Sequence, residues 1–377
     1  MQFDPSHLPA LTTEKWASVR DISIPLKRTE REGNNYRAEL AQATCFTGGA
    51  HALRFCNMAD AESMERATRI AQAVTENVNK GQRRFRMELE GRVFRAQLGV
   101  NSHEHDVQIR VLPAQAPTLA DLKMPPVWRS LLLSEHLLNG GLVLITAPNG
   151  QGKTTTASAI VSSRLKAFGG MANTVEDPIE LPLQGVWGNG LCIQRPADTA
   201  VEEVEPGQGY YRALIEALRQ FPAMSGGGTM LFVGEIRDAT TAAETLKAAA
   251  SGHLVLATMH ANSSEAAVRR MLTLSADARN GLDLFNAREM LASSLRAVFN
   301  QRLSWRNDGA GWGAASVVGE LLWSEDSETA VAESILSASL GNLHAAGRRQ
   351  ASVAGQWMEG QPVSELLHAL RGVDKQA

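Results

Sequence analysis

The sequence has few cysteines, no long apolar run and little net charge. Its three cysteines, Cys45, Cys56 and Cys192, stand far apart and form no Cys-x-x-Cys pair. This spacing argues against a cysteine zinc site and a disulfide framework, and it favours a reducing compartment. No stretch approaches the roughly 20 apolar residues of a membrane helix, and the first residues lack the pattern of a signal peptide. We therefore expect a cytoplasmic protein.

The charge balance gives no sign of a nucleic-acid surface. The 377-residue chain has 37 basic and 40 acidic residues and a formal net charge of −3. A nucleic-acid-binding domain more often carries an excess of basic residues along one face. The length predicts two or three domains, and the hydrophobic fraction of 44% is ordinary for a globular protein.

A proline-rich stretch divides the chain. Residues 1–112 combine short strand patterns with one helix pattern over 62–79, and we interpret them as a small α+β domain. Residues 113–126 contain four prolines and no periodicity, which predicts a linker. From 127 to 377 strands alternate with helices, which predicts an α/β domain with a mostly parallel sheet. We expect its C-terminal part, from about residue 280, to be helical, with a strong helix pattern over 287–299.

A glycine-rich turn follows the apolar run 141–146. Residues 147–154 read Ala-Pro-Asn-Gly-Gln-Gly-Lys-Thr, which is typical of a phosphate-binding loop, with Ala147 in place of the usual first glycine. In such a loop Lys153 reaches the β- and γ-phosphates of ATP, and the Thr154 hydroxyl holds Mg²⁺. The dipole of the following helix adds to the attraction. The predicted nucleotide-binding residues are Asn149, Gly150, Gln151, Gly152, Lys153, Thr154 and Thr155.

Carboxylates follow two other strand patterns. Glu235 ends the apolar run 230–234, where it could orient water or reach Mg²⁺ through water. Glu176, Asp177 and Glu180 follow the strand pattern 172–175 and could serve the metal's water shell or the attacking water. By local pattern alone, a turn with solvated acids explains this second group better.

Two histidines flank the strand pattern over 254–258. His260 follows it, at the carboxyl edge where ligands bind in parallel sheets, and His253 precedes it. Taken alone, such a pair is more often a packing feature than a catalytic one.

Taken together, these segments resemble the motor ATPases of type IV pili and type II and type IV secretion. Residues 147–154 match the family's Walker A motif, 175–180 its Asp box, 231–235 its Walker B motif and 252–262 its His box, with 213–222 matching a further helix. The nearest branches are the PilT-like retraction motors and the DotB-like ATPases of type IVB secretion and conjugation. The missing four-cysteine element favours these branches, but the retraction motif near the C-terminus is not legible.

The resemblance implies a RecA-like P-loop ATPase domain behind a smaller, PAS-like α+β domain, assembled as a homo-hexamer. It implies that Glu235, assisted by Glu180, activates water and that His260 senses the γ-phosphate. Arg95 and Arg110 would complete the site from the N-terminal domain, with Arg84, Arg86 and Arg92 as competing positions. The implied cofactors are ATP and Mg²⁺. The implied partners are inner-membrane platform or secretion-channel proteins, which would hold the ring at the inner membrane, with no direct contact to nucleic acid.

Three alternatives remain open from the sequence. The chain could be a nucleotide-gated scaffold that assembles and barely hydrolyses ATP. It could be a RecA-like nucleic-acid translocase, against which the acidic net charge argues. A small-molecule kinase fits least well, because it leaves the His box unexplained.

Overall fold

The computed structural model describes residues 8–12, 16, 19–29, 35–47, 52–55, 60–100, 105–113, 115–197, 208–222, 228–277, 281–304 and 316–374. These residues fall into two compact units, one up to residue 113 and the other from Gln115 onward. Among them, no helix is long and apolar enough to cross a membrane.

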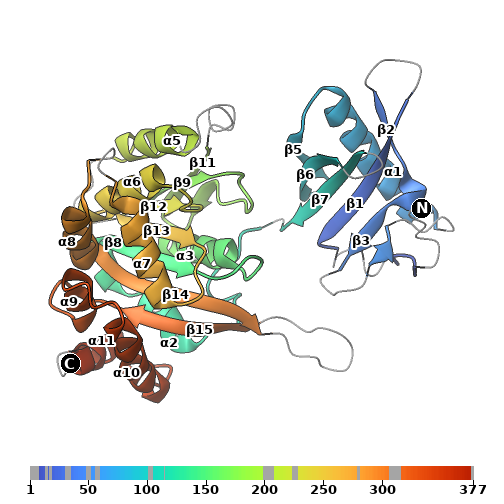
Figure 1. Cartoon of the computed structure of the whole chain (residues 1–377). Helices are drawn as coiled ribbons and strands as arrows, with labels where there is room; N and C mark the ends of the chain where they lie inside the picture. Colours follow the sequence, from blue (N-terminus) through green and yellow to red (C-terminus); the bar gives the residue numbers. More distant parts are fainter. Residues whose placement is uncertain are drawn as a thin grey trace. The chain divides into compact units, whose positions relative to one another are not determined.

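The first unit is an antiparallel sheet with a helix on one face (Figure 1). Its elements are β1 (Asp21–Arg28), β2 (Tyr36–Ala38), β3 (Thr44–Phe46), β4 (Leu53–Arg54), α1 (Ala61–Asn79), β5 (Arg84–Leu89), β6 (Arg92–Val100) and β7 (His105–Leu112). The strand order is β4-β3-β1-β7-β6-β5, with β2 beside β1. The side chain of Asp60 caps α1, and Ile70 and Val74 of this helix share one core with Ile22 and Ile24 of β1.

The second unit is built on an eight-stranded sheet of order β10-β11-β9-β12-β13-β8-β14-β15. Its strands are β8 (Gly141–Thr146), β9 (Gly170–Glu176), β10 (Gly185–Trp187), β11 (Gly190–Pro196), β12 (Thr229–Val233), β13 (Leu254–Met259), β14 (Leu295–Ser304) and β15 (Ser316–Trp323). The six strands from β11 to β14 run parallel, and β10 and β15 are antiparallel edge strands. The mostly parallel sheet expected from the sequence is therefore confirmed.

Helices cover both faces of this sheet (Figure 1). They are α2 (Pro126–Leu132), α3 (Lys153–Phe168), α5 (Gln208–Arg219), α6 (Ala239–Ala250), α7 (Ser264–Ser275), α8 (Leu284–Ser294), α9 (Ala330–Leu336), α10 (Asn342–Gln356) and α11 (Val363–Asp374). Alternate residues of β8 serve different cores: Leu142 and Leu144 pack with α5, α6, α7 and α8, whereas Val143 and Ile145 pack with α2 and α3. A central strand must be apolar on both faces for this reason.

The helix expected over 287–299 is wrong in its second half. α8 ends at Ser294, and β14 begins at the next residue between β8 and β15. The sheet therefore extends into the part of the chain expected to be helical from about residue 280. The apolar segment Leu295–Phe299 has no local signal that stops the helix, and pairing on both edges overrides its local preference.

Residues 115–126, which make up most of the proline-rich stretch, belong to the second unit and pack on it. Ala116, Leu119 and Met124 are buried in one of its two cores. The main chain is fastened to α3, because Leu119 N–H donates to Ser163 Oγ and Ser162 Oγ donates to Pro117 O. A stretch without periodicity can still bury separate apolar residues in this way.

Helix α10 runs past the edge strand β15. Its residue Leu343 packs in the core of one sheet face, and Val353 packs against the core of the other. Midway, the buried carboxamide of Gln350 accepts from Trp323 N–H at 2.8 Å and donates to Trp323 O at 2.7 Å. The outer side of β15 is therefore partly covered by this helix.

Candidate nucleotide-binding site

Four neighbouring parallel strands, β9, β12, β13 and β8, bring the predicted motifs to one edge of the sheet. Glu176 is the last residue of β9, Glu235 lies two residues after β12, His260 follows β13, and the glycine-rich loop follows β8. The carboxyl ends of parallel strands meet at the same edge, where such folds bind ligands.

The loop after β8 needs its glycines at two positions. Gly150 and Gly152 have φ of 72° and 78°, which L-residues with a side chain rarely adopt. Ala147, in contrast, is fully buried, and Glu90 and Ala338 are the non-glycine residues with positive φ in the described part of the chain. Alanine therefore occupies the first position of the loop without backbone strain.

Lys153 is folded back onto its own loop. Its Nζ donates to Ala147 O and Pro148 O, both at 3.2 Å, and lies 3.2 Å from His260 Nδ1. Burial lowers the pKa of Lys153, while the charges of Glu235 and Glu180 act in the opposite direction. A triphosphate bound at this loop would displace these groups as the partners of the Lys153 ammonium.

His260 joins the lysine to the carboxylate of Glu235. Its Nε2 lies 3.0 Å from Glu235 Oε1, and Arg237 donates to Glu235 Oε2 at 2.8 Å. Because Lys153 Nζ is a donor, His260 Nδ1 must accept, and the ring proton belongs on Nε2, facing the carboxylate. Both oxygens of Glu235 are therefore engaged in this arrangement.

The three carboxylates after β9 differ in surroundings. Glu176 is 2% exposed and accepts hydrogen bonds from Thr174 Oγ1 at 2.7 Å and Gln194 Nε2 at 2.9 Å. Burial raises the pKa of Glu176 despite these bonds. Asp177 and Glu180 are half-buried, and Glu180 is close enough to influence the charge of Lys153. Glu176 thus lies inside the protein, and the other two are accessible from the loop.

The oxygen groups beside the loop suit Mg²⁺ that is bound together with a phosphate. Thr154 and Thr155 stand in the first turn of α3 and are half-buried. In the described part of the chain, no cluster of three or more His, Cys, Asp or Glu side chains could hold a metal alone. Mg²⁺ in phosphate sites is bound by few protein groups, together with phosphate oxygens and water.

His253 lies at the opposite end of β13 from His260. Its Nδ1 is 2.9 Å from Thr229 Oγ1, and its ring stacks on Phe221 with 4.9 Å between centroids. Burial lowers the pKa of His253. A six-residue strand spans roughly 20 Å, so the structure does not bring His253 to the phosphate loop.

The arginines of the first unit form a row across its sheet. Arg86 is the register partner of Arg95, which in turn is the partner of Arg110, and Arg110 binds Asp21 at 3.1 Å. The competing Arg92 is engaged elsewhere, because it donates to Trp16 O and Val19 O and stacks over the Trp16 ring. The row Arg86–Arg95–Arg110 could not be recognised without the strand register.

Two residues near the loop were missed in the sequence. Asn300 and Gln301 of β14 are 5% and 1% exposed. Asn300 Nδ2 donates to Thr146 Oγ1 at 2.9 Å and to Ala261 O at 3.0 Å, and Gln301 Nε2 donates to Gln151 O at 2.6 Å. Adjacent amides in an apolar strand would be a signal, but the helix expected over 287–299 hides the strand and leaves these two residues just beyond its end.

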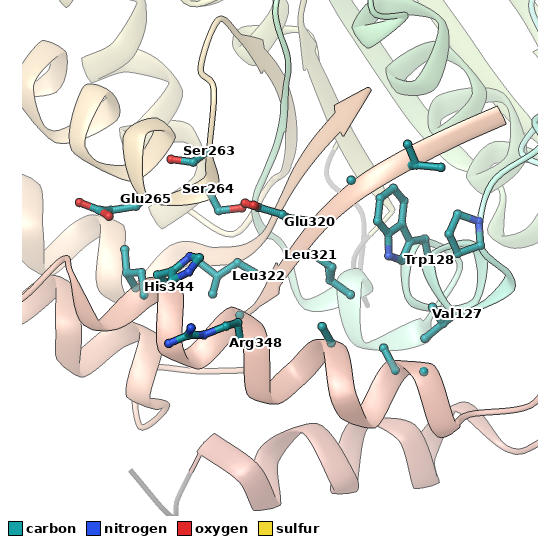
Figure 2. Close-up of a pocket in the computed structure, with 18 residues that line it drawn as sticks. Val127, Trp128, Ser263, Ser264, Glu265, Glu320, Leu321, Leu322, His344 and Arg348 are labelled. Atoms are coloured by element: carbon teal, nitrogen blue, oxygen red, sulfur yellow. The ribbon is translucent and has the colours of Figure 1, made fainter. Parts of the chain in front are cut away.

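A separate cavity of about 420 Å³ lies beyond β14. Figure 2 shows Trp128 of α2, Leu321 of β15 and Arg348 of α10 around it. Among the described residues that line it, none belongs to the predicted site.

Comparison with known proteins identifies the family. Residues 76–313, more than half of the chain, match the family described as "Type II/IV secretion system protein". The chain belongs to this family. Its relatives include the uncharacterized protein YggR of Escherichia coli K12, 32% identical over 227 residues that cover 60% of this chain and 63% of YggR. A twitching motility protein of Neisseria gonorrhoeae is 32% identical over 202 residues, covering 54% and 48% of the two chains.

Solved structures of similar fold include a pilus retraction motor, PilT, with bound ADP. The present chain aligns with this PilT structure at a TM-score of 0.62 and 21% identity, covering 93% of both chains. The ATPase DotB of Yersinia pseudotuberculosis aligns at a TM-score of 0.57 and 19% identity over 100% of both chains. The expected fold, a RecA-like α/β core with a smaller N-terminal unit, is thus confirmed, as is the resemblance to pilus and secretion ATPases. The chain spans less than two thirds of the length of the curated relatives named here.

Proposed function

We propose that this protein is an ATP-hydrolysing motor subunit of a type IV pilus or a type IVB secretion or conjugation system. The observation that carries the proposal is the chain of contacts from Lys153 through His260 to Glu235. These contacts lie at the sheet edge where the phosphate loop follows β8. They link a phosphate-binding cation to a carboxylate that can act on water, through one histidine.

The proposed reaction starts with the lysine changing partners. The γ-phosphate draws Lys153 Nζ away from Ala147 O and Pro148 O, while the amides of the loop bind the remaining phosphate oxygens. The Thr154 hydroxyl, together with Glu235 through a water molecule, would hold Mg²⁺, which would supply neutralisation of the phosphate charge. Glu235, released from Arg237 and His260 and assisted by Glu180, orients the attacking water and accepts its proton. The water oxygen bonds to the γ-phosphorus while the bond from that phosphorus to the bridging oxygen breaks, and ADP leaves.

His260 is the proposed sensor of the γ-phosphate. It contacts both Lys153 and Glu235, so displacement of the lysine changes what its Nδ1 faces. We further propose that Arg95 and Arg110 complete the site from the first unit and that the chain works as a homo-hexamer. A change of angle between units would then move an inner-membrane platform or channel protein. This would place the protein in the cytoplasm, at the inner membrane through partners.

A nucleotide-gated scaffold is the second candidate. It is favoured by the contacts of both Glu235 oxygens with His260 and Arg237, which compete with water for the carboxylate. Phosphate release from the purified full chain with ATP and Mg²⁺ separates the two. The motor requires turnover that is lost in Lys153→Ala by about 100-fold or more and kept in Lys166→Ala, which removes a lysine from the same helix. Nucleotide-dependent assembly without phosphate release would favour the scaffold.

A further inference from the structure

Two buried amides of β14 are unusual in a core strand. Asn300 and Gln301 are consecutive, so their side chains point to opposite faces of the sheet. Burying an amide costs free energy unless its hydrogen bonds are made. Both side chains donate hydrogen bonds to groups beside the phosphate loop and His260.

Gln151 is held from β14 by two bonds. Gln301 Nε2 donates to its main-chain oxygen at 2.6 Å, and Leu303 N–H donates to its side-chain Oε1 at 2.9 Å. Gln151 immediately precedes Gly152 and Lys153. The bonds therefore fix the part of the loop whose amides and lysine would face phosphate.

Asn300 connects a different pair of elements. Its Nδ2 bonds Thr146, the last residue of β8, and the carbonyl of Ala261, the residue after His260. A carbonyl can only accept, so the amide orientation is fixed. Asn300 thereby fastens the histidine's main chain to the strand that carries the phosphate loop.

We propose that Gln301 and Asn300 are positioning residues with separate tasks. Gln301 sets the phosphate loop for nucleotide binding. Asn300 sets the main chain of His260 for turnover. The expected effects on ATP binding and turnover rest on the proposed ATPase function. The ordering of the loop by Gln301 can be measured without nucleotide.

The experiment compares Gln301→Met and Asn300→Leu with Gln350→Met. Gln350 is a matched control, since it is also fully buried and also bonds the main chain, but at Trp323. The first readout is hydrogen exchange of residues 147–155 in the nucleotide-free full chain. We expect exchange in Gln301→Met to be about fivefold to tenfold faster than in the wild type and unchanged in Gln350→Met.

The second readout is the affinity for a fluorescent ATP analogue with the kinetics of phosphate release. We expect Gln301→Met to raise Kd and KM about fivefold to tenfold while kcat stays within about threefold. Asn300→Leu should lower kcat about tenfold with KM nearly unchanged. Equal effects of both changes on kcat and KM, or wild-type behaviour of either, would overturn the assignment.

Gln151→Ala keeps the test decisive if Gln301→Met does not fold. It removes the bond from Leu303 N–H at a half-buried side chain. Unchanged loop exchange in this variant would contradict the ordering of the loop by its bonds from β14. If the wild type neither binds nor hydrolyses ATP, the proposed function fails, whereas loop exchange still decides whether β14 positions the loop.

Discussion

His260 Nε2 lies 3.0 Å from Glu235 Oε1, although the two residues follow different strands, β13 and β12. The contact exists because β12 and β13 are parallel neighbours whose carboxyl ends coincide. It makes the histidine the partner of the carboxylate on one side and of Lys153 on the other.

Glu235→Gln should preserve ATP binding and stop turnover. Glutamine retains an oxygen for the His260 N–H but cannot accept a proton from water, so we expect kcat to fall about 10²–10⁴-fold. Phosphate release and binding of a fluorescent ATP analogue measure the two effects. Glu244→Gln, on the neighbouring helix α6, should resemble the wild type. Turnover above half of the wild-type rate in Glu235→Gln would remove Glu235 from the mechanism.

Substitutions of the two histidines that flank β13 should have different effects, one on activity and the other on stability. His260→Ala is expected to lower kcat about 100-fold and to leave the melting temperature nearly unchanged. His253→Ala loses its contacts with Thr229 and Phe221, which should cost about 1–2 kcal/mol in the free energy of unfolding. Calorimetry and phosphate release on both variants check this. Comparable losses of activity in both variants would contradict the assignment of His260 alone to the site.

Glu176→Gln should stabilise the protein increasingly as the pH rises. The folded-state pKa of Glu176 is raised by burial, so its stability contribution is present below the unfolded pKa and lost as the pH rises through the folded pKa. Glutamine does not titrate and can accept the same two hydrogen bonds through its oxygen. We expect its melting temperature to exceed that of the wild type by about 2–4 °C at pH 8 and by less at pH 5.

Scanning fluorimetry from pH 5 to pH 8 measures this difference. Glu333→Gln, on the exposed side of α9, serves as the control and should show a constant difference near zero. A pH-independent effect of Glu176→Gln would mean that burial does not govern this carboxyl.

The arginine row should affect turnover but not the affinity of the second unit for nucleotide. Arg95→Ala or Arg110→Ala is expected to reduce kcat about 10³-fold if these guanidinium groups stabilise the transferred phosphate. Their register neighbour Arg86 should have a related effect. Arg84→Ala is the control, because Arg84 lies on β5 like Arg86 but pairs with Gln97, outside the row. Wild-type turnover in both Arg95→Ala and Arg110→Ala would exclude a role for the row.

The sequence suffices for features that a short segment carries by itself. The strand, glycine-rich loop and helix could be predicted here because the glycines, lysine and threonine are contiguous and follow an apolar run. The placement of His253 and His260 at opposite ends of β13 follows from the sequence, because one precedes the strand and the other follows it. The sequence could not distinguish the buried Glu176 from the accessible Asp177 and Glu180, because burial depends on how Thr174 and Gln194 close around the carboxylate.

Features that depend on strand register could not be predicted. The row Arg86–Arg95–Arg110 requires the pairing of three strands. The amides of Asn300 and Gln301 were hidden because the helical pattern before them continues to residue 299, past Ser294, where α8 ends. Tertiary pairing with β8, rather than local propensity, makes that segment a strand.

The position of α10 has a consequence for the behaviour of the chain in concentrated solution. An uncovered edge strand is a template on which other chains can pair and aggregate. Gln350 occupies the main-chain groups of Trp323 that an incoming strand would need, and the helix around it blocks the approach. The helix and this one carboxamide therefore protect this end of β15 from intermolecular sheet formation.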